Sequence, residues 1–137
     1  MKKKVFTVSI LGLVAVLGLL AWRNTPYKQA VRFIQQNGPE LTRLIDSGQP
    51  LPLDLGWQFY NCWDGEHPMT EFILASHDGT YYGVYYSPDD VPLSFQNSGA
   101  ELKAAPETGW QWKGKGVSHG TTQKIVDGWY YFTAVPG

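Results

Sequence analysis

Three histidines, two of them next to a carboxylate, are the residues of this sequence that could do acid–base chemistry. Asp78 directly follows His77, and His119 lies in a glycine-rich loop. An imidazole oriented by a carboxylate can act as a general base for a serine hydroxyl. No nucleophile-elbow or oxyanion-type glycine motif surrounds these residues. A small hydrolase-like enzyme using His67, His77, Asp78 or His119 is therefore an alternative hypothesis, and we assign no catalytic residue.

Two carboxylate-rich stretches could attract a metal ion. Asp64, Glu66 and His67 lie within four residues, but their spacing matches no common ligand pattern. Asp89 and Asp90 follow a Ser-Pro pair and lack the Asp-x-Asp-x-Asp-Gly pattern of a calcium loop. We predict polar turns at both places, no metal site and no cofactor.

Aromatic side chains are the best candidates for a binding surface. Sixteen of the twenty aromatic residues follow residue 56. Tryptophan and tyrosine combine a large apolar area with a polar group, which suits them to interfaces. The candidate binding residues are Trp57, Trp63, Tyr82, Tyr86, Trp110 and Trp112.

Composition and charge exclude several classes of protein. Among the 137 residues, 43% are apolar and 15% aromatic, which excludes a disordered chain. The net charge is -1, and residues 51–107 hold nine acids and one base, so we expect no nucleic acid as a partner. The single cysteine excludes a disulfide framework, and we expect Cys62 to be a buried structural thiol.

The elements that would position these residues begin with helices. Thr25-Pro26 combines an N-cap residue with proline at the first helical position, which predicts a helix over 27–36. Asn37-Gly38-Pro39 is expected to end that helix and start a second one over 40–47.

Beyond residue 56 the apolar period changes from 3.6 to 2, and two Asp-Gly pairs predict β-hairpins. A two-residue loop also predicts register: Ala75 opposite Tyr82 and Ile73 opposite Val84. The flanking strands are 69–77 and 80–87 in the first hairpin, and 121–126 and 129–135 in the second.

In the second hairpin the same rule places Ile125 opposite Tyr130. Neither face of the first hairpin is polar, so each must be covered, one by the helical region and the other by further chain, a second sheet or a partner.

Two more segments are expected to be strands. In 57–63, Trp57, Phe59 and Trp63 should share one side, and in 110–115 Trp110 and Trp112 should point inward. Residues 87–108 form a long loop. The predicted fold is α+β: an N-terminal transmembrane helix and short helical arm, then an antiparallel β-sheet of about five strands with two Asp-Gly hairpins.

The N-terminal segment predicts a membrane anchor. Residues 5–22 carry no charge, and as a helix they would span about 27 Å, close to the hydrocarbon thickness of a bilayer. We favour an uncleaved signal anchor at 1–24, with a cleaved signal peptide as the alternative. The remaining 25–137 form one small domain, helical over 25–48 and β-rich over 57–137, which we expect to be extracytoplasmic.

Together these patterns favour a single-pass, membrane-anchored protein whose outer domain is a non-enzymatic binding or accessory domain. Its expected partners are the membrane, through residues 5–22, and a protein or the cell wall. Besides the hydrolase, a structural accessory subunit of a membrane complex is the other alternative.

Overall fold

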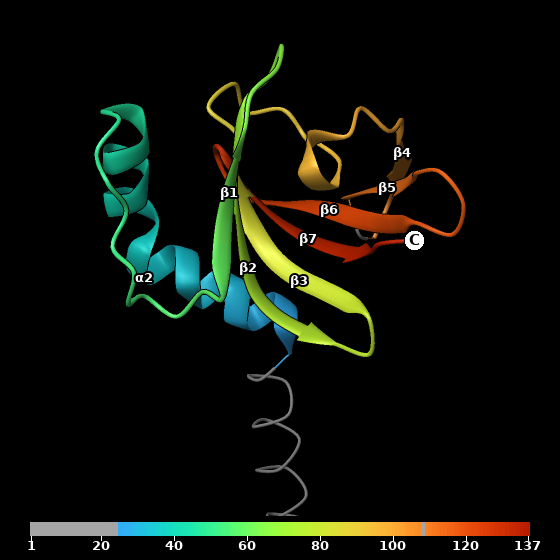
Figure 1. Cartoon of the computed structure of the whole chain (residues 1–137), viewed down its shortest axis with the longest axis horizontal. Helices are drawn as coiled ribbons and strands as arrows, with labels where there is room; N and C mark the ends of the chain where they lie inside the picture. Colours follow the sequence, from blue (N-terminus) through green and yellow to red (C-terminus); the bar gives the residue numbers. More distant parts are fainter. Residues whose placement is uncertain (1–24, 108) are drawn as a thin grey trace, which may run out of the picture.

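One long helix precedes a seven-stranded antiparallel sheet in the computed structural model (Figure 1), of which residues 25–107 and 109–137 are described. The strands lie in the spatial order β1-β2-β3-β7-β6-β5-β4, so the two Asp-Gly hairpins meet at the centre. In chain order the elements are α2 (Pro26–Asp46), β1 (Phe59–Trp63), β2 (Met69–His77), β3 (Thr80–Tyr86), the 3-10 turn η1 (Phe95–Asn97), β4 (Leu102–Ala105), β5 (Gly109–Lys113), β6 (His119–Val126) and β7 (Trp129–Val135).

The predicted fold class is wrong in its details. The sheet has seven strands and not about five, and the strand that was not expected is 102–105, which pairs with β5 inside the segment 87–108 that was predicted to be a loop. None of the helices within residues 25–107 and 109–137 is long and apolar enough to cross a membrane. The expected transmembrane segment, 5–22, lies outside the described residues.

The helical arm is one helix where two were predicted. Thr25 is its N-cap and accepts a hydrogen bond from the Lys28 amide at 3.4 Å, and Pro26 occupies the first turn as expected. The helix continues through Gly38 and Pro39, and it bends in this region because proline cannot donate to the preceding turn (Figure 1).

Helix α2 covers one face of the sheet, packing on β2, β3 and β7. Its buried side chains meet apolar side chains from these three strands, which follows from the 3.6-residue spacing of its apolar positions. This helix-side core contains Ala30, Phe33, Ile34, Leu41, Phe72, Val84, Tyr86, Trp129 and Tyr131.

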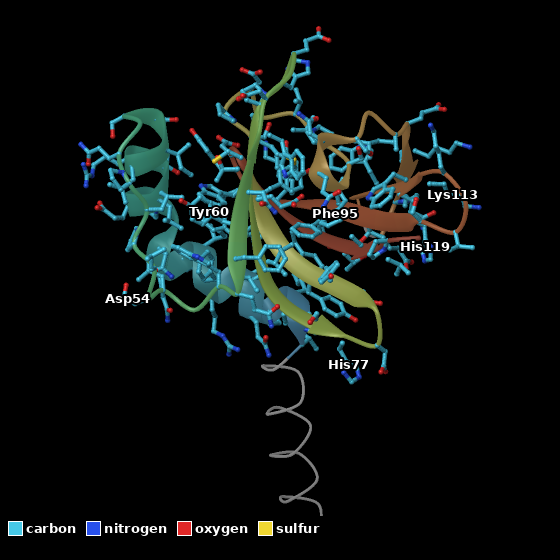
Figure 2. All side chains as sticks on the ribbon, in the orientation of Figure 1. Asp54, Tyr60, His77, Phe95, Lys113 and His119 are labelled. Carbon is cyan, nitrogen blue, oxygen red and sulfur yellow. The ribbon has the colours of Figure 1, made fainter. Side chains whose placement is uncertain are left out.

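The opposite face of the sheet is covered by the chain itself. The segment between β3 and β4, which includes η1, packs over it, and the tryptophans of β5 fold toward it. Phe95 stacks on Trp112 with ring centroids 6.5 Å apart, and lies 5.6 Å from Phe132 (Figure 2). This loop-side core contains Met69, Ile73, Tyr85, Trp112, Tyr130, Phe132 and Ala134.

Both Asp-Gly hairpins form, but each contains a β-bulge. The pairs next to the first turn agree with the prediction, including Ala75 with Tyr82. Leu74 is an extra residue, so Ile73 pairs with Gly83 and not with Val84.

The second hairpin repeats this arrangement. Ile125 is the extra residue in β6, so Tyr130 pairs with Lys124 and not with Ile125. Leu74 and Ile125 both pack against the helix-side core, which explains why the register shifts at these two positions.

Gly83 lies opposite the first bulge, where no side chain fits. A methyl group there would overlap the main-chain oxygen of Phe72 and approach the Phe132 ring to 2.8 Å. We predict that Gly83→Ala lowers the free energy of unfolding by roughly 3 kcal/mol, the scale of overpacking in a core. Urea denaturation measures this, with Thr80→Ala in the same strand as the control, and equal stability of the two variants would contradict it.

Candidate binding site

A groove of about 520 Å³ lies between α2 and the turn of the β6–β7 hairpin. It forms because the helix packs mainly on β2, β3 and β7, whereas β6 contributes only Ile125 to the apolar side chains packed on this face. Its lining is mainly apolar, as in most sites that bind other molecules. The lining residues are Tyr27, Val31, Ile34, Gln35, Gly38, Pro39, Thr42, Ile125, Val126, Asp127 and Trp129.

The floor and helical wall of the groove are fixed by Trp129. Its indole N–H donates to Thr42 Oγ1 at 2.9 Å, while its ring lies 5.9 Å from Phe72 in the helix-side core. Gly38 lies beside this ring: a methyl group there would make an ordinary contact of 3.8 Å with Trp129 Nε1 and a tight one of 3.0 Å with Ile34 of the same helix. The groove therefore has a rigid, apolar floor.

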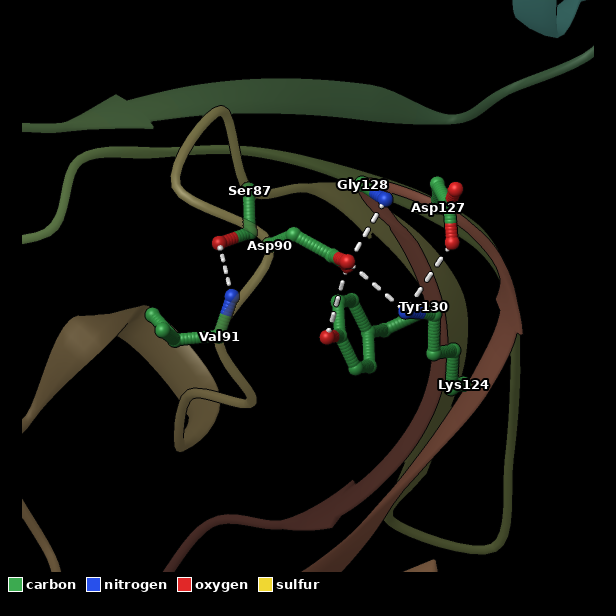
Figure 3. Close-up of polar contacts among 7 residues, drawn as sticks. All are labelled: Ser87, Asp90, Val91, Lys124, Asp127, Gly128 and Tyr130. Atoms are coloured by element: carbon green, nitrogen blue, oxygen red, sulfur yellow. Dashed lines mark hydrogen bonds and ion pairs between the residues drawn. The ribbon is translucent and has the colours of Figure 1, made fainter.

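The other wall is the turn of the hairpin, and Asp90 holds it from the loop side (Figure 3). Asp90 Oδ1 accepts from the main-chain amide of Gly128 at 2.9 Å and from the hydroxyl of Tyr130 at 3.0 Å. Asp90 Oδ2 pairs with Lys124 Nζ at 2.7 Å, and Lys124 also reaches Asp127 at 3.1 Å.

These contacts make Asp90 a charged anchor for the turn. The hydrogen bond from Lys124, followed by that from the Gly128 amide, lowers the pKa of Asp90 to about 2. The main chain of Asp90 has a positive φ of 53°, which turns its carboxylate toward the hairpin. The sequence predicted only a polar turn here, and this anchoring role was missed because its partners lie more than thirty residues away.

A second anchor, which unlike Asp90 is buried, lies on the loop side of the sheet. Glu71 is fully buried, and its Oε2 accepts from the Gln96 amide at 2.9 Å. Its Oε1 has no hydrogen-bond partner among the described residues. Burial raises the pKa of Glu71 to about 7, although the Gln96 amide and the Trp63 indole oppose this.

The structure divides the six predicted binding residues between the two faces of the sheet. Three belong to the helix-side core or pack on it, and three to the loop-side core. Tyr86 and Trp112 are buried, and the other four are half-buried, so they form no single surface. The helix-side residues are Trp57, Tyr82 and Tyr86, and the loop-side residues are Trp63, Trp110 and Trp112.

Two predictions about β1 and the residues just before it are wrong. Trp57 lies on the helix side with Tyr60, whereas Phe59 contacts Tyr81 on the other side of the sheet. Cys62 is exposed and not buried, and it lies in β1, an edge strand of the sheet. Trp110 and Trp112, by contrast, face the loop-side core as expected.

The residues of the hydrolase hypothesis do not come together (Figure 2). His77 pairs with Asp78 at 3.1 Å on an exposed turn, and His119 contacts the main-chain oxygen of Val117. The strand order separates His77 from His119 by three strand spacings, roughly 14 Å.

His67 pairs instead with Asp89 at 2.9 Å, which ties the turn after β1 to the loop after β3. Within residues 25–107 and 109–137, His, Cys, Asp and Glu side chains form no group of three that could hold a metal ion.

Comparisons with protein-family models, with curated protein sequences and with solved structures gave no match for this chain.

We predict that Asp90 contributes to folding stability and that this contribution is lost in acid. Asp90→Asn removes the charged contact to Lys124 and should lower the melting temperature at pH 7 by roughly 5 °C, the size expected for losing charge-assisted hydrogen bonds. The pKa of Asp90 is lower in the folded than in the unfolded chain, so its contribution is present above about pH 4 and is lost as the pH falls toward 2. Calorimetry across this range should show less acid destabilisation in the variant.

The neighbouring carboxylate provides the control for this experiment. Asp89 is equally exposed and contacts only His67 among the described side chains. Asp89→Asn should leave the melting temperature within about 2 °C of the wild type. Equal losses from both variants would contradict the anchoring role of Asp90.

For Glu71 we predict the opposite dependence of folding stability on pH. Between about pH 4.5 and 7 the folded chain keeps a proton on Glu71 that the unfolded chain has lost, so stability should fall as the pH rises through this window. Glu71→Gln keeps an acceptor for Gln96 without the charge, and should raise the free energy of unfolding at pH 8 by about 2 kcal/mol. Urea denaturation at pH 5 and 8 tests this against exposed Glu101→Gln, and no gain at pH 8 would refute it.

Proposed function

We propose that this chain is a non-enzymatic binding or accessory domain that takes an apolar segment of a protein partner in the groove between α2 and the β6–β7 turn. The observation that carries this proposal is the groove itself, a cavity of about 520 Å³ with an apolar lining. Its size lies within the range of sites that bind small molecules or side chains of a partner.

The position of Val126 supports binding to an apolar group. Its side chain is 51% exposed on the groove wall, beside the half-buried Ile125. Covering such a side chain contributes on the order of 1–2 kcal/mol to association. A partner that fills the groove would remove this exposed apolar surface from water.

The polar groups of the groove favour a protein segment over a cell-wall glycan. Thr42 is already bonded to Trp129 and Asp127 to Lys124, which leaves Tyr27 and Gln35 as the other polar side chains of the lining. A glycan presents many hydroxyl groups that would lose water without finding partners in so apolar a groove. The expected location at the cell envelope depends on residues outside the described part and stays a prediction.

Photo-crosslinking in cells that express the full-length chain tests this function. A benzoylphenylalanine placed at Gln35, which is exposed on the helical wall, should give an adduct of one defined mass. Val126→Asp on the opposite wall should reduce the yield of this adduct about tenfold, because it places an unpaired charge in the binding surface.

Val117→Asp is the matched control, since Val117 is 74% exposed on the loop before β6 and does not line the groove. It should leave the adduct unchanged. Failure to form any adduct at Gln35, or equal loss in both aspartate variants, would overturn the proposed function.

A further inference from the structure

The first strand of the sheet has an open edge. In the described chain β1 pairs with β2 on one side and with no strand on the other. The Ile73 carbonyl accepts from the Gln58 amide at 2.8 Å, so Ile73 faces β1, whereas the Phe72 oxygen lies toward Gly83 of β3. Because paired residues of antiparallel strands alternate between bonding each other and facing away, Phe59, Asn61 and Trp63 bond β2. The main-chain groups of Tyr60 and Cys62 face the open edge.

This edge lacks the features that usually prevent strand pairing. Residues 59–63 contain no charge and no proline, and the side chains of Phe59 and Tyr60 are 45% and 36% exposed. The other edge strand, β4, is shorter, carries Lys103 and is followed by Pro106. Charges, proline and short strands protect natural edges against pairing, so β4 is protected and β1 is not.

A small pocket lies beside the open edge on the helix side. It has a volume of about 230 Å³ and lies between the end of α2, the loop that follows it, and β1. When a segment is added to a sheet edge, alternate side chains of the segment point to the same face, and pockets on that face provide specificity. The lining residues are Ile45, Gly48, Gln49, Pro50, Leu51, Tyr60, Cys62 and Thr70.

The surroundings of the edge are acidic. Asp54 lies on the loop that leads to β1 (Figure 2), and Asp64 and Glu66 follow the strand directly. All three are exposed, and between residues 44 and 102 the chain contains no lysine or arginine. A segment that pairs with β1 therefore meets negative charge at both of its ends.

We propose that the open edge of β1 binds an extended segment of a protein partner by strand addition, with an apolar side chain in the pocket beside Tyr60 and Cys62 and basic residues at the ends of the segment. Main-chain hydrogen bonds to Tyr60 and Cys62 hold the segment. The basic residues face Asp54, Asp64 and Glu66, which speeds association and selects the partner. This surface is separate from the groove at the β6–β7 turn.

The same charges disfavour a second copy of this chain as the occupant. Antiparallel pairing of two β1 strands would bring the acidic residues after one strand beside the acidic loop before the other. Like charges placed together at an interface oppose association.

A displayed library of random twelve-residue peptides, selected on the full-length chain, tests this proposal. Enriched peptides should alternate apolar residues and carry lysine or arginine at their ends. Cys62→Pro removes an outward amide without breaking a main-chain bond to β2, and should weaken binding of these peptides at least tenfold. Cys62→Val loses the same thiol but keeps the amide, and should bind within about twofold of the wild type.

Two further measurements keep the test decisive if Cys62→Pro fails to fold. N-methylation of alternate peptide amides should weaken binding to the wild-type chain at least tenfold. The Asp64→Lys, Glu66→Lys double variant should weaken it as much by reversing the charge beside the edge. The proposal is overturned if no peptide is enriched, if methylation has no effect, or if the enriched peptides are acidic. A dimer that Cys62→Pro dissociates would overturn it in favour of a second copy.

Binding to this edge and binding in the groove can fail independently. Val126→Asp should leave peptide binding at β1 unchanged, and Cys62→Pro should leave the crosslink at Gln35 unchanged.

Discussion

The aromatic strand pair at the centre of the sheet is the constraint on which the rest of the structure depends. Strands β3 and β7 carry large rings on both faces, so neither face can be left in water. Tyr85 and Tyr130 stack on the loop side with centroids 5.1 Å apart, while Tyr86 and Trp129 lie 5.2 Å apart on the helix side. A small domain satisfies this requirement only if other parts of its chain pack on both faces of the sheet.

The two covers are made in different ways. A single amphipathic helix buries the first face, and Pro39 bends it in its second half. The second face is covered by an irregular loop, whose main-chain groups need fixed partners because a buried loop cannot rely on water. The Tyr85 hydroxyl bonds to Thr122 and accepts from the Leu93 amide, and Glu71 accepts from the Gln96 amide.

Both candidate surfaces arise where this double covering stops. The helix packs mainly on β2, β3 and β7, which produces the groove beside β6, and the sheet ends at β1 with no further strand in the described chain, which produces the open edge. Asp90 connects the two layers, because it belongs to the covering loop but positions the turn that forms the groove wall. The groove and the open edge therefore depend on where the helix and the sheet end. The positions of the tryptophans in the sequence did not indicate either surface.

Local sequence determined the elements whose signals are local. The Asp-Gly pairs fixed both hairpin turns, Thr25-Pro26 fixed the start of the helix, and strict alternation placed Trp110 and Trp112 on the buried face. Only the tertiary structure decided the rest. Packing on Trp129 and the sheet carries the helix through Gly38 and Pro39, although both residues disfavour a helix interior.

The two bulges, the groove and the anchoring role of Asp90 likewise depend on tertiary structure. Leu74 and Ile125 are drawn toward the helix-side core by contacts with residues distant in the chain, and Asp90 meets Gly128 and Tyr130 only after the sheet has formed. The sequence shows that both faces of the hairpins are apolar, but the order of the strands decides which part of the chain covers each face and which edge stays open.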